Sequence, residues 1–142
     1  MSANSASAVN TSASSMSHPN FAILYVDDAL ISARFYADIL EIEPVEAQAA
    51  FALFVLRSGL KLGLWAKSDV LPEVTAPSGG SELAIALESE QEFERTYQNW
   101  QARGVVIAQV PTSMDFGLTF VALDPDGHRL RVFVPAQALA AS

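Results

Sequence analysis

Two groups of side chains have the types and spacing expected of a site for a flat aromatic molecule. Arg131 and Phe133 alternate along an apolar stretch that follows Asp124-Pro125-Asp126-Gly127. Trp65 stands two residues after Gly63. Aromatic rings stack on planar ligands, and a guanidinium binds a carboxylate through two parallel hydrogen bonds. The sequence shows no Ser-His-Asp set, phosphate-binding glycine loop or close carboxylate pair, so these groups indicate binding more than catalysis.

Residues 117–134 are predicted to form a β-hairpin. Pro125 presets its own φ and Gly127 accepts a positive φ, so a tight turn joins two runs rich in Val, Phe and Leu. Direct pairing across this turn places Val121 opposite Leu130. One face is then aliphatic and packs against a helix, and the other is mixed: Leu118, Phe120, Ala122, Arg129, Arg131 and Phe133. We expect the ligand on the mixed face, although a β-bulge would exchange the assignments on one side.

A second hairpin is predicted from the strands 51–56 and 61–65, joined by Arg57-Ser58-Gly59. Direct pairing again gives an aliphatic face, with Leu53, Val55, Leu62 and Leu64. The mixed face then carries Ala52, Phe54, Leu56, Lys61, Gly63 and Trp65. The absent side chain of Gly63 is expected to leave room beside the flat ring of Trp65.

The remaining elements make each half of the chain read strand, helix, strand, strand, which is an internal repeat. The first half begins with a strand at 21–26 and a helix at about 29–40, capped by Asp27 or Asp28, and gains a short strand near 43–48. The second has a strand at 82–87, a helix from the capping box Ser89–Glu92 to Arg103, and a strand at 105–110. Residues 112–116 are predicted to be a loop.

Composition shifts divide the chain into five segments. These are a disordered tail (1–18), a first module (19–70), a linker rich in Pro and Gly (71–80), a second module (81–137) and a C-terminal tail (138–142). The 142 residues are 51% hydrophobic, with a net charge of −8, which argues against nucleic acid and anionic membranes as partners. The sequence has no cysteine, no apolar run of membrane-spanning length and no secretory signal, so we expect a cytoplasmic protein.

Several motifs, in this order, resemble the vicinal oxygen chelate superfamily, which includes glyoxalase I, extradiol dioxygenases and bleomycin-resistance proteins. They are Val26-Asp27-Asp28, Phe35-Tyr36, the linker, and Asp124-Pro125-Asp126-Gly127. The resemblance covers residues 20–135 and implies an α+β fold of the glyoxalase/bleomycin resistance type. In that fold, paired βαβββ modules form a curved-sheet cup, usually in a homodimer.

Shorter stretches resemble those members of the superfamily that confer resistance to phenazine antibiotics. They are residues 61–65, 116–120, 124–128 and 131–132. This resemblance implies metal-independent sequestration of a planar aromatic small molecule by a homodimer. The alternatives are a lyase, isomerase or dioxygenase of the same superfamily, and a dimeric scaffold without a small ligand. We expect a binding protein rather than an enzyme, with no catalytic residue.

The metal site of the superfamily is not expected to survive in this chain. Metal-dependent members place His or Glu at four cup-facing positions, and the resemblance carries these to Phe21, Gly63, Glu82 and Arg131. Phe and Gly offer no ligand atom, and Arg is a permanent cation. His128 is more typical of a turn residue than of a ligand. We therefore expect no metal and no cofactor.

The candidate ligand-binding residues leave several alternatives open. Trp65 either stacks on the ligand or fills the core, and Arg131 pairs either with a ligand carboxylate or with Glu82. An acid–base enzyme would use Glu82, with a pKa raised by burial. Met114 and Phe116 either form a lid or close the core edge. The full set of candidates is Tyr25, Phe54, Gly63, Trp65, Glu82, Met114, Phe116, Phe120, Arg131 and Phe133.

Overall fold

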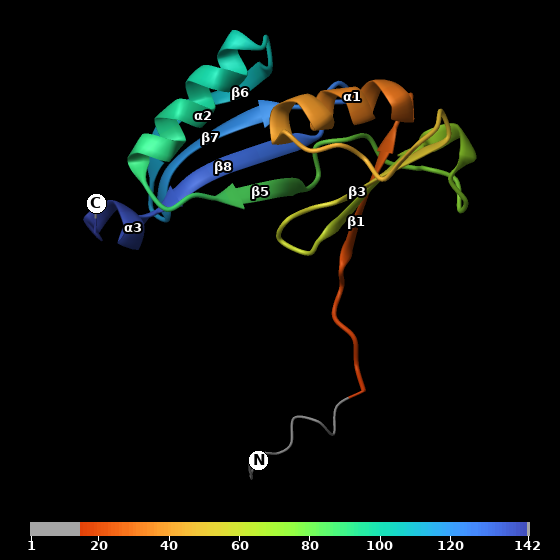
Figure 1. The fold of residues 1–142 in the computed structure, drawn as a ribbon, viewed down its shortest axis with the longest axis horizontal. Helices are drawn as coiled ribbons and strands as arrows, with labels where there is room; N and C mark the ends of the chain where they lie inside the picture. The colour runs from red at the N-terminus through yellow and green to blue at the C-terminus, as the bar shows by residue number, and fades with distance from the viewer. Residues whose placement is uncertain (1–14, 142) are drawn as a thin grey trace.

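The computed structural model describes residues 15–141 and confirms the predicted α+β fold, with two four-stranded mixed sheets (Figure 1). The first sheet has the order β1-β4-β3-β2, and the second has the order β5-β8-β7-β6. In each sheet the first strand runs parallel to its neighbour, and the other pairs are antiparallel. The first module comprises β1 (Phe21–Val26), α1 (Ala29–Leu40), β2 (Glu46–Ala47), β3 (Phe51–Val55) and β4 (Lys61–Ala66). The second comprises β5 (Glu82–Ala86), α2 (Glu90–Ala102), β6 (Val106–Met114), β7 (Gly117–Leu123) and β8 (Arg129–Pro135).

Each helix begins at the cap that its sequence indicates and covers one face of a sheet. The Asp28 carboxylate accepts from the backbone N–H of Leu30 at 2.9 Å, and the Ser89 hydroxyl accepts from that of Glu92 at 3.1 Å. Helix α1 packs on β3 and β4, and α2 packs on β8. Figure 1 shows α2 over one face of the second sheet, and none of the helices within residues 15–141 lies on the other face. We call the sheet faces turned away from the helices the open face.

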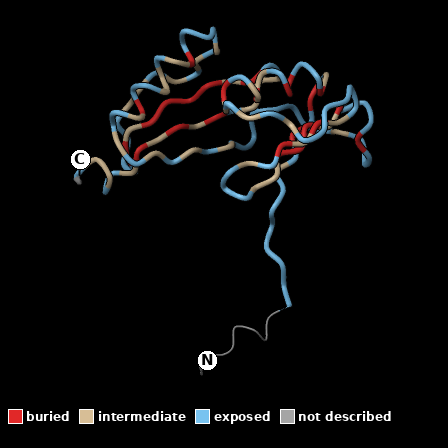
Figure 2. Tube along the Cα trace, in the orientation of Figure 1, coloured by how far each residue is buried: buried red, intermediate tan, exposed pale blue. Residues whose placement is uncertain are grey.

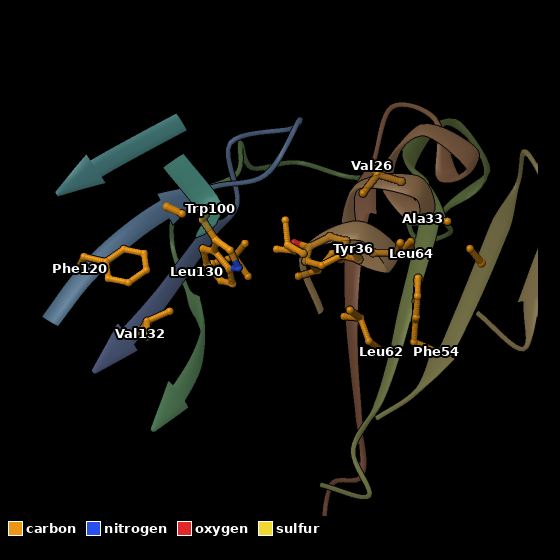
Figure 3. Packing of buried hydrophobic residues seen from close by; sticks show 14 of the residues in the cluster. Val26, Ala33, Tyr36, Phe54, Leu62, Leu64, Trp100, Phe120, Leu130 and Val132 are labelled. Atoms are coloured by element: carbon orange, nitrogen blue, oxygen red, sulfur yellow. The ribbon is translucent and has the colours of Figure 1, made fainter. Parts of the chain in front are cut away.

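A continuous apolar core joins the two modules beneath the helices (Figure 2). Figure 3 shows Tyr36 between the buried side chains of the first module and those around Trp100 and Leu130 of the second. The Tyr36 hydroxyl donates to the Asp124 carboxylate at 2.7 Å. Burial first, and then the Asp124 charge, raises the pKa of Tyr36. A buried phenol bound to a buried carboxylate therefore fixes α1 against the β7–β8 turn.

That turn makes further hydrogen bonds to the first module. Asp126 accepts from the Asp27 backbone N–H at 2.9 Å and from the Ser32 hydroxyl at 3.2 Å. The Nε2 atom of His128 lies 2.8 Å from the Tyr25 carbonyl, to which it donates. The residues of this turn thus hold the two modules together, and His128 acts as a turn residue.

Both hairpins contain a β-bulge, and the predicted direct pairing is wrong in each. The backbone N–H of Leu56 donates to Leu60, and that of Asp124 donates to His128. In each turn a glycine with positive φ follows, Gly59 at 97° and Gly127 at 86°. This is a type I turn completed by a glycine bulge, which leaves three residues between the hydrogen-bonded pair, where the predicted pairing leaves an even number. Val55 therefore faces Lys61, and Leu123 faces Arg129.

The structure also differs from the predicted elements in three places, the first of which is a short 3₁₀-helix at Lys67–Asp69 that directly follows β4 and was not predicted. Strand β6 continues to Met114, so part of the predicted loop at 112–116 belongs to the second sheet. A short helix, α3 (Ala136–Ala141), follows β8 and was not predicted. The first fourteen residues of the predicted disordered tail lie outside the described residues. None of the helices within residues 15–141 is long and apolar enough to cross a membrane.

Candidate ligand site

The first cluster of candidate residues lies on the open face of the first sheet. Tyr25 and Trp65 are paired on neighbouring strands, with ring centroids 6.4 Å apart and an interplanar angle of 74°. Trp65 is half-buried, and Tyr25 is 41% exposed. Phe51 pairs with Trp65 across β3 and β4. Because paired residues project to the same side of a sheet, three aromatic side chains share this surface.

The room predicted beside Gly63 is occupied in the structure. A methyl group added at Gly63 would lie 3.1 Å from the ring of Phe51. The Phe51 ring therefore covers the glycine, and the expectation of an empty space next to Trp65 is wrong. Gly63 still serves the site, because a side chain at this position would crowd the Phe51 ring, whose residue pairs with Trp65.

The second cluster lies on the open face of the second sheet and is centred on Arg131. The Nε and Nη2 atoms of Arg131 donate to the two carboxylate oxygens of Glu82 at 2.8 and 2.9 Å. Its Nη1 atom donates to Gln109 at 3.2 Å and to Thr119 at 3.1 Å. The sequence left a ligand carboxylate and Glu82 as alternative partners of Arg131, and in the structure Arg131 is paired with Glu82.

Aromatic side chains border this ion pair. The Arg131 guanidinium carbon lies 5.9 Å from the centre of the Phe116 ring, within reach of a cation–π interaction. Phe116 and Phe133 meet edge to face, with centroids 5.7 Å apart. Met114 ends β6 and is exposed. The cluster therefore combines a neutralised guanidinium with two aromatic rings on an uncovered surface.

The pKa of Glu82 is shifted downward, whereas a general acid needs a raised pKa. The hydrogen bonds from Arg131 lower the pKa of Glu82, and they outweigh the effect of burial, which raises it. The expectation that burial would raise this pKa is wrong, because the Glu82 side chain is 29% exposed and paired with a cation. At neutral pH Glu82 is therefore an ionised partner of Arg131 rather than a proton donor.

Phe54 and Phe120 lie on the helix side of their sheets, so their predicted place on the ligand face is wrong. Both are 0% exposed. Phe120 contacts the rings of Phe93, Tyr97 and Trp100 with centroid distances of 5.3, 5.1 and 5.7 Å (Figure 3). The glycine bulges explain both errors, since a shift of one residue moves a side chain to the other face.

The four positions of the superfamily's metal site do not fit a metal in this chain. Phe21 and Gly63 supply no donor, and the guanidinium of Arg131 already holds the carboxylate of Glu82. Within residues 15–141, no group of three or more His, Cys, Asp or Glu side chains could hold an ion. The side chains at these four positions therefore support no metal-dependent step.

Three site residues were not predicted from the sequence: Phe51, Gln109 and Thr119. Each lies on the open face only because of the true hairpin register or the irregular pairing of β6 with β7. The signal available in the sequence was the position of Gly59 and Gly127, four residues after the last paired residue of each first strand. A glycine at that place is typical of a type I turn with a bulge.

Comparison with known proteins gives a consistent family and fold. The sequence profile of the Glyoxalase/Bleomycin resistance protein/Dioxygenase superfamily matches residues 16–132. The chain is 27% identical over 117 residues to the phenazine antibiotic resistance protein EhpR of Enterobacter agglomerans, covering 80% of this chain and 89% of that protein.

Two solved structures resemble this one. A protein of Agrobacterium tumefaciens solved by NMR is 47% identical, with a TM-score of 0.78 over 85% of this chain and 99% of that chain. A glyoxalase-related enzyme from Fulvimarina pelagi has a TM-score of 0.74 at 22% identity, covering 84% of this chain and 88% of its own. The second likeness concerns the fold alone.

Proposed function

The chain belongs to the Glyoxalase/Bleomycin resistance protein/Dioxygenase superfamily, and we propose that it binds and sequesters a planar aromatic small molecule of phenazine type without turning it over. The observation that carries this proposal is Trp65, a half-buried indole flanked by Tyr25 and Phe51 on the open face of the first sheet. The relationship to a phenazine antibiotic resistance protein supports the same ligand class. Tolerance would then come from lowering the free concentration of the compound.

The energetics of such binding are adequate for a resistance protein. Stacking on one indole face contributes about 0.5–1.5 kcal/mol beyond burial. Burial of a three-ring ligand adds several kcal/mol at about 25 cal/mol per Å². After the cost of association, a dissociation constant of roughly micromolar order is expected.

Titration of the protein with phenazine compounds tests the proposal. We expect saturable quenching of the intrinsic Trp fluorescence and a matching one-site isotherm in calorimetry, with the compound recovered unchanged. Absence of binding would exclude this ligand class. Recovery of a chemically altered compound would place the protein among the enzymes of its superfamily.

We also propose that the protein is a homodimer with two equivalent cups. Three apolar side chains project from the open face of β1, where Phe21 and Ile23 are each 47% exposed and Tyr25 is 41% exposed. The second module has its own exposed apolar side chains, Val106, Val110 and Phe116. Large exposed apolar side chains on one strand face commonly mark an interface, and a second copy would cover them.

Light scattering at micromolar concentration is expected to give the mass of a dimer. The change Ile23→Glu places a charge on the open face and should produce a monomer. The matched control is Ile31→Glu on helix α1, where the side chain is 59% exposed and away from the open face, and this variant should remain dimeric. A stable wild-type monomer would contradict the proposal.

A further inference from the structure

The hydrogen-bonding capacity of Arg131 is almost fully used within the chain. A guanidinium carries five N–H groups, and four of those of Arg131 donate to Glu82, Gln109 and Thr119. The Nε and Nη2 atoms donate to the two carboxylate oxygens of Glu82, and the Nη1 atom donates to Gln109 and Thr119. The one remaining N–H of the guanidinium cannot form a second bidentate interaction with a carboxylate.

The edge of Arg131 that could bind a ligand carboxylate through two hydrogen bonds is therefore already occupied by the Glu82 carboxylate. To gain two hydrogen bonds a ligand carboxylate would have to displace the Glu82 carboxylate, leaving two anions beside one cation. Arg129 does not replace the lost partner, because it is half exposed and its Nη1 atom lies 4.0 Å from Glu82. Such an exposed cation offers little binding energy to an anion.

The surroundings of the ion pair suit an uncharged ring system instead. Ala84 pairs with Arg131, and Ala86 pairs with Phe133, so small side chains line β5 on this face. Phe116 and Phe133 add two rings next to the guanidinium. The contacts left for a ligand are aromatic faces and methyl groups.

We propose that Glu82 is a specificity-determining residue of the ligand site, because its carboxylate occupies Arg131 and thereby selects uncharged planar aromatics over carboxylated ones. This inference rests on the proposed function, since it takes the open face of the second sheet as part of the surface that binds the ligand and assigns the charge class of that ligand. Selectivity then comes from an unfavourable contact with the wrong ligand as much as from a favourable contact with the right one.

The test compares a phenazine carboxamide with the corresponding phenazine carboxylate, which have similar shape and differ in charge. Calorimetry near neutral pH should show that the wild type binds the carboxamide at least about tenfold more tightly. In Glu82→Gln, Arg131 loses its anionic partner. The affinity for the carboxylate should then rise by about tenfold, while that for the carboxamide stays within about twofold.

Two further variants keep the result interpretable. Glu94→Gln removes the same charge on the exposed side of α2 and should leave the preference unchanged. Arg131→Gln leaves Glu82 with only the exposed Arg129 as a nearby cation, at 4.0 Å, and should weaken carboxylate binding further, which tests the inference even if Glu82→Gln does not fold. Circular dichroism confirms the fold of each variant.

Each outcome separates this inference from the proposed function. A wild type that binds the carboxylate as tightly as the carboxamide, or a Glu82→Gln variant with unchanged preference, overturns the role of Glu82 and leaves the proposed function standing. A wild type that binds neither compound overturns the proposed function, and the inference with it.

Discussion

Replacement of Phe120 with alanine is expected to lower the free energy of unfolding by about 3–5 kcal/mol. The Phe120 ring is fully buried among Phe93, Tyr97 and Trp100, so its removal leaves a cavity beneath α2. A loss of this size is a large part of the stability of a small domain. Urea denaturation followed by circular dichroism, at one protein concentration, measures it.

Phe116→Ala is the matched control for Phe120→Ala. The same atoms are removed, but Phe116 is 43% exposed and contacts Phe133 and Arg131 at the open face. We expect a loss of about 1 kcal/mol or less, because most of the ring is already in contact with water. Equal losses in the two variants would contradict the assignment of Phe120 to the core.

Replacement of Trp65 with alanine is expected to weaken the binding of an uncharged phenazine by about tenfold or more, with the fold retained. The change removes both the stacking surface and the apolar area of the indole, which together exceed about 1.4 kcal/mol. Trp65 is only half-buried, so its loss should destabilise the chain less than that of Phe120. Calorimetric titration measures the affinity, and denaturation measures the stability.

Two conservative variants separate stacking from simple burial at Trp65. Trp65→Phe retains an aromatic face and should recover most of the affinity. Trp65→Leu retains apolar volume without an aromatic face and should bind nearly as weakly as Trp65→Ala. Unchanged affinity in Trp65→Ala would refute the role of the indole, and equal affinity in the Phe and Leu variants would show that burial alone matters.

The two variants Phe120→Ala and Trp65→Ala also bear on how cup-facing aromatic residues are identified in this fold. Both residues belong to strands of hairpins whose turns contain a glycine bulge. Trp65 keeps its predicted place on the open face, because the true register exchanges the two faces of β3 and not those of β4. Phe54 lies on β3 and therefore moves to the helix side of its sheet. Phe120 lies on β7, whose faces are exchanged in the same way in the second hairpin.

The sequence by itself determined the strands, the helices α1 and α2, and the order of these elements. The period of the apolar residues and the capping residues Asp28 and Ser89 were enough to place both helices, because these signals act within a few neighbouring residues. The repeat of strand, helix, strand, strand was visible for the same reason. The motifs around Val26, Tyr36 and Asp124 then indicated the superfamily, which the sequence profile confirms.

Only the tertiary structure decided which side chains face the open surface and what Arg131 binds. The face of every strand residue depends on register, and one additional turn residue reverses it. The partners of Arg131 come from β5, β6 and β7, which are distant in sequence. Sequence spacing could not choose between a ligand carboxylate and Glu82 for the guanidinium. The parallel pairing of β5 with β8 made that choice, because it brings the Glu82 carboxylate within hydrogen-bond distance of Arg131.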